Sequence, residues 1–116
     1  MFERYPNFPY ILAHTGGATI LLFERLDNGF RLFPDCRKYI SKLPSEYGKR
    51  LYYDTCAFGE PALMVALGSV GASQLLFGTD DPFIGADAAH VKRLPIAEAD
   101  KARILHGNAA RMLALA

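Results

Sequence analysis

Three polar residues that could do chemistry, His14, Asp54 and Asp80, each come shortly after an apolar run. The runs that precede them are residues 8–13, 51–53 and 74–77. Imidazole and carboxylate groups can exchange protons with a substrate. Since polar residues that follow strands build the sites of parallel sheets, the repeated pattern predicts one active-site face.

The runs themselves predict the elements that position these residues. Each run is continuous rather than alternating, as expected for a strand buried on both faces of a parallel sheet. A turn signal and a helical pattern follow each run, which predicts parallel strands joined by crossover helices. The C-terminal ends of such strands share one edge, so we expect His14, Asp54 and Asp80 to emerge there together.

The first helical pattern has an apolar and a polar side. Phe23, Leu26 and Phe30 share one side, which we expect to pack on the outside of the sheet. The polar residues on the other side are Glu24, Arg25, Asp27 and Asn28. The segment 31–50 contains two prolines and a glycine, and we expect a long surface connection there.

Two further helices carry start and stop signals. Pro61 suits a first helical position, residues 62–70 continue the helix, and Gly71 ends it. Asn108 is predicted to be the N-cap of a last helix over residues 109–115.

Composition limits the function classes. The chain has 116 residues, of which 51% are hydrophobic and 22% charged, so it is long enough for one small globular domain. A net charge of +1 disfavours a nucleic-acid-binding protein. Cys36 and Cys56 form neither a C-x-x-C motif nor a disulfide framework. With no signal peptide or membrane-length apolar run, we expect a cytoplasmic protein.

Four polar motifs resemble those of one enzyme family in order and spacing. They are His14-Thr15-Gly16-Gly17 with Arg25 eleven positions after His14, Pro44–Tyr47 followed by Tyr52–Thr55, Gly78-Thr79-Asp80-Asp81-Pro82-Phe83, and Gly107-Asn108-Ala109-Ala110-Arg111. Together they resemble the amidohydrolase-related metal-dependent hydrolases, including the aminocarboxymuconate-semialdehyde and resorcylate decarboxylases. The sequence departs from the family pattern at Ile20-Leu21, where the family usually has Pro-Tyr or Pro-Phe.

The resemblance implies a partial barrel. Residues 1–116 would be a single partial domain, the C-terminal three βα units of a (β/α)8 barrel, whereas a complete barrel takes about 250 residues. The family's H-x-H metal pair and its further histidine ligand have no counterpart here, because His90 and His106 lie in helical sequence rather than after a strand. Either the chain is a fragment of a longer enzyme or Met1 is an internal start.

The resemblance also assigns roles to three side chains. Asp80 would be catalytic and a ligand of a divalent metal, expected to be zinc, whose bound water it helps to orient. His14 would be the general acid or base. Arg25 would bind the substrate carboxylate, in the pocket of the neighbouring subunit of a homodimer. A turn aspartate, a structural histidine and a solvated arginine remain the alternatives, and Cys56 is expected to pack rather than react.

The expected activity is therefore decarboxylation or hydrolysis of a small carboxylated substrate, with neither nucleic acid nor membrane as a partner. The isolated chain is expected to lack a full metal site and to be inactive. Two other interpretations stay open: a catalytically inactive remnant, and a half-enzyme that needs a second polypeptide carrying the N-terminal units.

Overall fold

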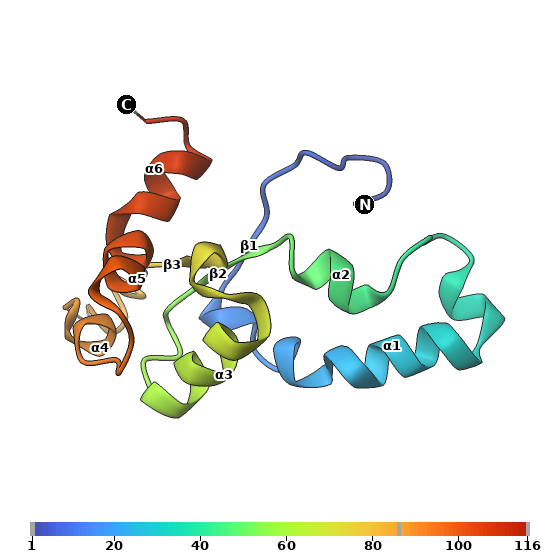
Figure 1. Ribbon diagram of the computed structural model, residues 1–116, viewed down its shortest axis with the longest axis horizontal. Coiled ribbons are helices and arrows are strands. Elements are labelled where there is room, and N and C mark those ends of the chain that lie inside the picture. The colour runs from blue at the N-terminus through green and yellow to red at the C-terminus, as the bar shows by residue number, and fades with distance from the viewer. Residues whose placement is uncertain (1, 86, 116) are drawn as a thin grey trace.

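A computed structural model describes residues 2–85 and 87–115, so both ends of the predicted domain, residues 1 and 116, lie outside the description (Figure 1). No helix in these ranges combines the length and apolar character needed to cross a membrane. The elements in chain order are β1 (Ile11–Leu12), η1 (His14–Gly16), η2 (Ile20–Leu22), α1 (Phe23–Leu32), η3 (Pro34–Arg37), α2 (Pro44–Gly48), β2 (Tyr52–Asp54), α3 (Glu60–Val70), η4 (Ala72–Gln74), β3 (Leu75–Leu76), α4 (Ala89–Lys92), α5 (Glu98–Ala102), η5 (Arg103–Gly107) and α6 (Asn108–Met112).

The three strands form one parallel sheet in the order β1-β2-β3. Ile11 pairs with Tyr52 on one side of β2, and Tyr53 pairs with Leu75 on the other. The prediction of parallel strands is confirmed. The strands are shorter than the apolar runs, and in β1 one reason is that Pro9 has no N–H to donate to a partner.

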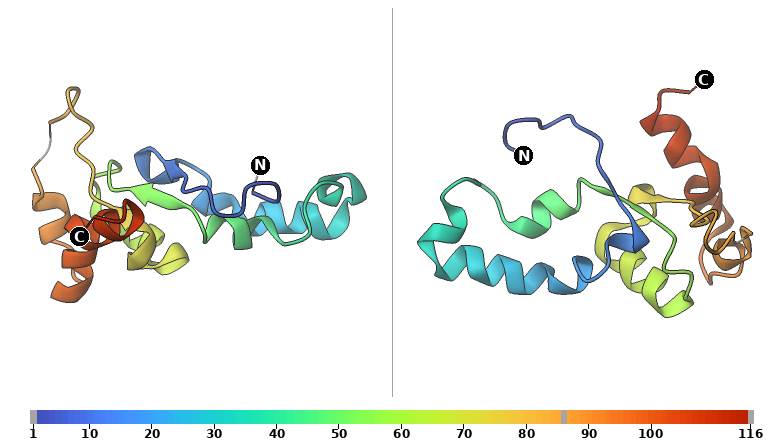
Figure 2. Two further views of the ribbon diagram at one scale, coloured as in Figure 1. Left: turned by 90° about the horizontal axis from the view of Figure 1, so that it is seen from above. Right: turned by 180° about the vertical axis from the view of Figure 1, so that it is seen from behind.

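Burial on both faces holds for β2 and β3 but not for β1. Tyr53 and Leu75 are fully buried, whereas Ile11 is 46% exposed. The expectation was wrong for β1 because η5 and α6 pack on β3, the other edge strand, whereas β1 packs mainly against β2 in the described residues. Its other edge is open in the described structure (Figure 2).

The core lies between the sheet, α3 and the C-terminal helices. Helix α3 has a proline in its first turn and ends at Gly71, whose φ is 82°, as the sequence predicted. The buried apolar residues of this core are Ile20, Leu51, Tyr53, Leu63, Ala66, Leu75, Val91, Leu94 and Ile104.

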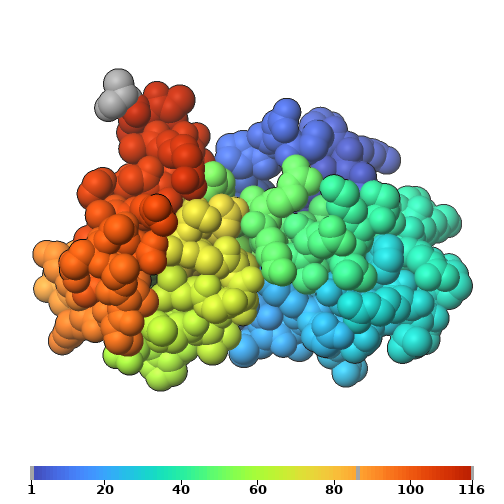
Figure 3. Space-filling model, viewed as in Figure 1, coloured from blue at the N-terminus to red at the C-terminus, as the bar shows by residue number. Residues whose placement is uncertain are grey.

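Helices α1 and α2 form an arm that extends away from the sheet (Figure 1). In the space-filling view this segment, cyan to green, makes up the side opposite the C-terminal helices (Figure 3). The predicted packing of α1 on the sheet holds only for Phe23, which packs against the core, because most of α1 instead packs along α2. Asp27, expected on the solvent side, is buried and accepts hydrogen bonds from Ser45 N (2.9 Å) and Oγ (2.6 Å). Leu26, expected to face inward, is exposed. The segment 31–50 is therefore not only a surface connection, since it contains the helix that supports α1.

The arm makes the molecule elongated. The radius of gyration is 15.2 Å, whereas a compact domain of this length would have about 13 Å.

Asn108 does not cap a helix. It lies inside a continuous helical stretch in which η5, a wide π-type turn, joins α5 to α6. Its side chain is fully buried, and its Nδ2 donates to the carbonyls of Ala72 and Leu75, each at 2.7 Å. The predicted N-cap role was wrong because the side-chain amide donates instead to these two carbonyls, which lie just before and at the start of β3.

Asn108→Ala should lower the free energy of unfolding by about 2 kcal/mol, because two carbonyls lose a buried donor. Asn28→Ala on the exposed face of α1 is the matched control and should change it by less than about 0.5 kcal/mol. Denaturant unfolding followed by circular dichroism measures both. Equal effects of the two substitutions would contradict the anchoring role of Asn108.

Candidate active site

His14 and Asp80 approach each other at the C-terminal edge of the sheet. His14 Nε2 lies 3.6 Å from Asp80 Oδ1, and their side chains are 67% and 27% exposed. The predicted convergence of the two residues is confirmed. At this separation the pair is not directly hydrogen-bonded, and both groups remain accessible to a third molecule.

A left-handed turn presents His14. Its φ is 54°, Thr15 has 55°, and Gly16 and Gly17 have 75° and 54°. Gly16 is also required for packing, since a Cβ there would lie 2.7 Å from the Tyr53 ring. The H-T-G-G sequence is thus two residues held in a disfavoured conformation, followed by two glycines that adopt it freely.

Asp54 at the end of β2 holds this turn. Its carboxylate accepts the backbone N–H of His14 (3.0 Å), Thr15 (2.8 Å) and Cys56 (2.9 Å). The Thr15 hydroxyl donates to Asp54 O at 3.0 Å and accepts the N–H of Ala57 at 3.1 Å. Asp54 emerges at the predicted edge, but its carboxylate is engaged by backbone rather than pointed at a substrate. Its position at the edge was signalled in the sequence by a polar residue directly after the apolar run that ends at Tyr53.

Asp80 begins the loop that projects beyond β3 (Figure 2). Its φ is 56°, also left-handed. Gly78 leads into this turn, and a Cβ there would lie 2.7 Å from Cys56 Sγ. Close packing against β2 therefore fixes the start of the Asp80 loop.

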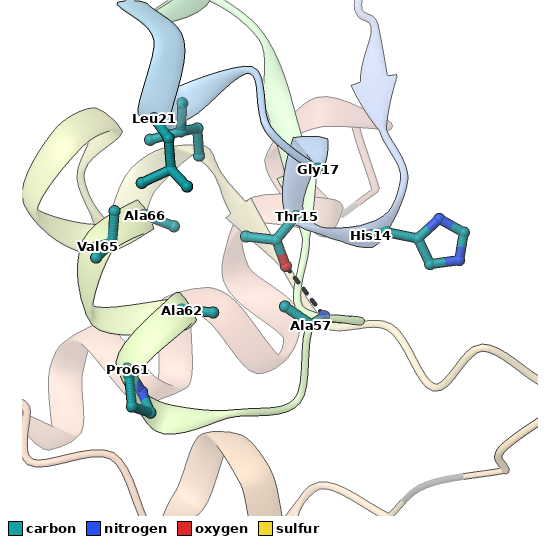
Figure 4. Close-up of a pocket in the computed structure, with 10 residues that line it drawn as sticks. His14, Thr15, Gly17, Leu21, Ala57, Pro61, Ala62, Val65 and Ala66 are labelled. Atoms are coloured by element: carbon teal, nitrogen blue, oxygen red, sulfur yellow. Dashed lines mark hydrogen bonds between the residues drawn. The ribbon is translucent and has the colours of Figure 1, made fainter.

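A small apolar cavity lies behind the His14 turn. It has a volume of about 250 Å³ and lies between the turn and α3. Its lining residues are His14, Thr15, Gly17, Ile20, Leu21, Ala57, Pro61, Ala62, Val65 and Ala66. Figure 4 shows the His14 ring turned away from this cavity, so the cavity is separate from the polar edge that His14 shares with Asp80.

Arg25 is not brought to this edge. It is exposed on α1 and lines a groove of about 740 Å³ together with apolar residues of the arm, such as Leu22 and Phe33. Within residues 2–85 and 87–115 its guanidinium makes no ion pair.

The described residues contain no group of three His, Cys, Asp or Glu side chains that could hold a metal ion. His106 is exposed on η5. His90 on α4 lies against Phe58 and Phe77, with ring centroids at 5.1 and 5.6 Å. Asp80 can thus contribute one carboxylate oxygen to a metal, and His14 lies beside it, but the described residues supply only part of a donor set.

Cys56 is packed rather than reactive. Burial, and then the Asp54 carboxylate nearby, raise the pKa of the Cys56 thiol to about 11. At neutral pH the thiol therefore stays protonated and is a poor nucleophile. This agrees with the expected packing role.

The sequence model of one protein family, described as amidohydrolase, matches residues 1–115. A 2-amino-3-carboxymuconate-6-semialdehyde decarboxylase of Dictyostelium discoideum is 28% identical over 99% of this chain and 33% of its own length. A gamma-resorcylate decarboxylase of Polaromonas sp. is 30% identical over 99% of this chain and 37% of its own length. The chain thus spans about a third of the length of the curated relatives it matches.

Solved structures show the same arrangement of elements. The 5-carboxyvanillate decarboxylase of Sphingomonas paucimobilis matches 99% of this chain and 36% of its own, with a TM-score of 0.87 and 25% identity. A dihydroxybenzoic acid decarboxylase of Polaromonas sp., with bound manganese and the inhibitor 2-nitroresorcinol, matches 98% and 36%, with a TM-score of 0.85 and 30% identity. The predicted fold, part of a (β/α)8 barrel, is confirmed.

Alkylation by iodoacetamide at pH 8 should label Cys36, which is exposed, well before Cys56. With its pKa raised to about 11, Cys56 has a thiolate fraction about 100-fold below that of an ordinary thiol. Peptide mass spectrometry after timed quenching measures both rates, and denaturant should make them equal. A Cys56 that reacts as fast as Cys36 in the folded chain would contradict the packing role.

Proposed function

The chain belongs to the amidohydrolase family, and on that premise we propose that it forms the C-terminal part of the active site of a metal-dependent decarboxylase. The proposal is supported by the approach of His14 and Asp80 to 3.6 Å at the edge where such barrels carry their sites. Its named relatives are decarboxylases, which favours decarboxylation over hydrolysis.

His14 holds the proton in this proposal. Decarboxylation breaks the bond between the substrate carbon and its carboxylate, carbon dioxide leaves, and the carbon takes a proton in its place. His14 Nε2 is exposed and directed toward the reaction edge, where an imidazole can deliver that proton near neutral pH. Asp80 lies 3.6 Å from this ring, at the same edge.

Asp80 also binds the metal in this proposal. A carboxylate oxygen suits a hard divalent cation, and Asp80 is accessible at the edge. The metal would neutralise negative charge on the substrate. The family resemblance implied zinc, whereas the solved dihydroxybenzoic acid decarboxylase carries manganese, so we propose a divalent metal and test both ions.

The substrate is a small carboxylated molecule of the type that the relatives' names describe, such as gamma-resorcylate. Arg25 is an exposed guanidinium whose two-pronged geometry suits a carboxylate. Since Arg25 lies on the arm, away from His14, we assign it to the site of a second copy in a cytoplasmic homodimer.

Activity in this proposal requires more than residues 1–116. We use the term assembled barrel for this chain together with a segment that corresponds to the part of its relatives that the chain does not match. That segment is either on the same polypeptide or supplied as a second one. The incomplete donor set of the described residues favours this interpretation over a self-sufficient enzyme. An inert remnant is the rival, and it predicts no gain of activity on assembly.

Metal content separates these interpretations. The chain alone should lose added zinc or manganese on dialysis, because one carboxylate and one imidazole are fewer than the three or four ligands of a stable site. The assembled barrel should retain about one ion, and Asp80→Asn should abolish this retention. Asp81→Asn, the exposed neighbouring carboxylate, is the control and should leave it intact. Plasma mass spectrometry provides the measurement, and stoichiometric metal on the chain alone would contradict the proposal.

Carbon dioxide release from gamma-resorcylate and from 2-amino-3-carboxymuconate-6-semialdehyde tests the reaction itself. In the assembled barrel His14→Gln should lower kcat by about 100- to 10,000-fold, the range expected for loss of a general acid. His106→Gln, an exposed histidine on η5, should leave kcat unchanged. No release from either substrate by the metal-loaded barrel would argue for the inert remnant.

A further inference from the structure

Two polar residues, Asp54 at the end of the central strand β2 and Thr55 directly after it, contact the loops of opposite neighbours. Asp54 holds the His14 turn after β1. Thr55 is fully buried and contacts the Asp80 loop after β3, through Gly78. The two residues that approach each other across the edge are therefore each tied to the strand between them.

The Asp54 side requires a carboxylate. Three backbone N–H groups point at its two oxygens: Thr15 N and Cys56 N at Oδ1, and His14 N at Oδ2. An asparagine has the same shape but only one acceptor oxygen. Its amide NH₂ would replace the other oxygen and would face a backbone N–H, so that two donors would oppose each other. The substitution thus releases part of the turn without creating a cavity.

The Thr55 side forms a chain of hydrogen bonds whose directions can be assigned. His90 Nδ1 lies 3.0 Å from Asp87 O, and a carbonyl only accepts, so Nδ1 carries the proton of the neutral ring. His90 Nε2 then accepts from the Thr55 hydroxyl at 2.9 Å. The same hydroxyl oxygen accepts the N–H of Gly78 at 3.1 Å.

This chain holds the Asp80 loop at both ends. Gly78 lies two residues before Asp80, and His90 lies ten residues after it, on α4. Phe58 and Phe77 contact the His90 ring and limit its movement. Because one hydroxyl bonds to both Gly78 and His90, removing it releases both of these contacts.

We propose that Asp54 and Thr55 are positioning residues that set the separation of His14 and Asp80, with His90 as the partner of Thr55. The proposal rests on the function proposed above. It assigns neither residue to contact with substrate. Of the two loops that carry His14 and Asp80, Asp54 bonds to the first, at His14 and Thr15, and Thr55 to the second, at Gly78 and His90.

Hydrogen exchange measured by mass spectrometry on the assembled barrel tests this division. Asp54→Asn should speed exchange about tenfold in the peptide covering residues 13–17, with little change over residues 78–85, since loss of one hydrogen bond to a charged group accounts for about that factor. Thr55→Val should do the reverse. Thr55→Ser retains the hydroxyl and should restore exchange and kcat to within about twofold of the unmodified barrel. Asp35→Asn, on exposed η3, is the charge-matched control.

Kinetics then separates positioning from general stability. Asp54→Asn and Thr55→Val should each lower kcat by about 10- to 100-fold with KM nearly unchanged, because a displacement of about 1 Å at reacting groups has this effect. Faster exchange in both loops and in α3 alike would overturn the proposal, and so would faster local exchange with unchanged kcat. If the unmodified barrel decarboxylates nothing, the proposed function fails, and the exchange pattern still decides whether the two loops are held separately.

Discussion

Parallel pairing of β1 and β3 with the two sides of β2 is the constraint from which the polar edge follows. It brings three loops to one edge, and the residue types at the end of β2 then determine how these loops are held. Tyr53 is fully buried and its ring packs against Gly16, so the apolar core and the His14 turn share one side chain. Burial raises the pKa of Tyr53 to about 12, and its hydroxyl donates to Gly48 O, which connects the same residue to the arm.

In the His14 turn, the free-energy cost of left-handed backbone is opposed by hydrogen bonds to the Asp54 carboxylate. Left-handed backbone costs about 1–2 kcal/mol for each of His14 and Thr15. Hydrogen bonds to a charged acceptor contribute about 1.5–3 kcal/mol each, and Asp54 provides one to each of these residues. The two effects are of similar size, so the hydrogen bonds to the Asp54 carboxylate offset the cost of the left-handed backbone. His14 can therefore occupy a conformation that its own side chain would not favour.

The sequence predicted the parallel strands, helix α3 and the meeting of His14 with Asp80, because apolar runs, prolines and glycines act locally. It did not predict the packing of the arm or the role of Asn108, since both depend on partners distant along the chain: Ser45 for Asp27, and the carbonyls of Ala72 and Leu75 for Asn108. For Asp54 the sequence could not separate a turn-forming role from a role in the pocket, for a related reason. A carboxylate bound by backbone and one aimed at a substrate have the same sequence signal. The domain extent and the roles of His14, Asp80 and Arg25 remain predictions.

The wide π-type turn η5 has a consequence for how the length of this region can vary in evolution. A π-type turn contains one residue more than the α-helical path, and a residue added or removed rotates everything beyond it by about 100° about the helix axis. Two residues of this stretch bond to the segment of β3. The carbonyl of Ile104 accepts the N–H of Phe77, and the side-chain amide of Asn108 donates to the carbonyl of Leu75. A single-residue deletion that restored regular α-helix here would turn Asn108 out of register with Leu75. Insertions and deletions should therefore be tolerated in the loops on either side of the stretch 98–112 and excluded within it.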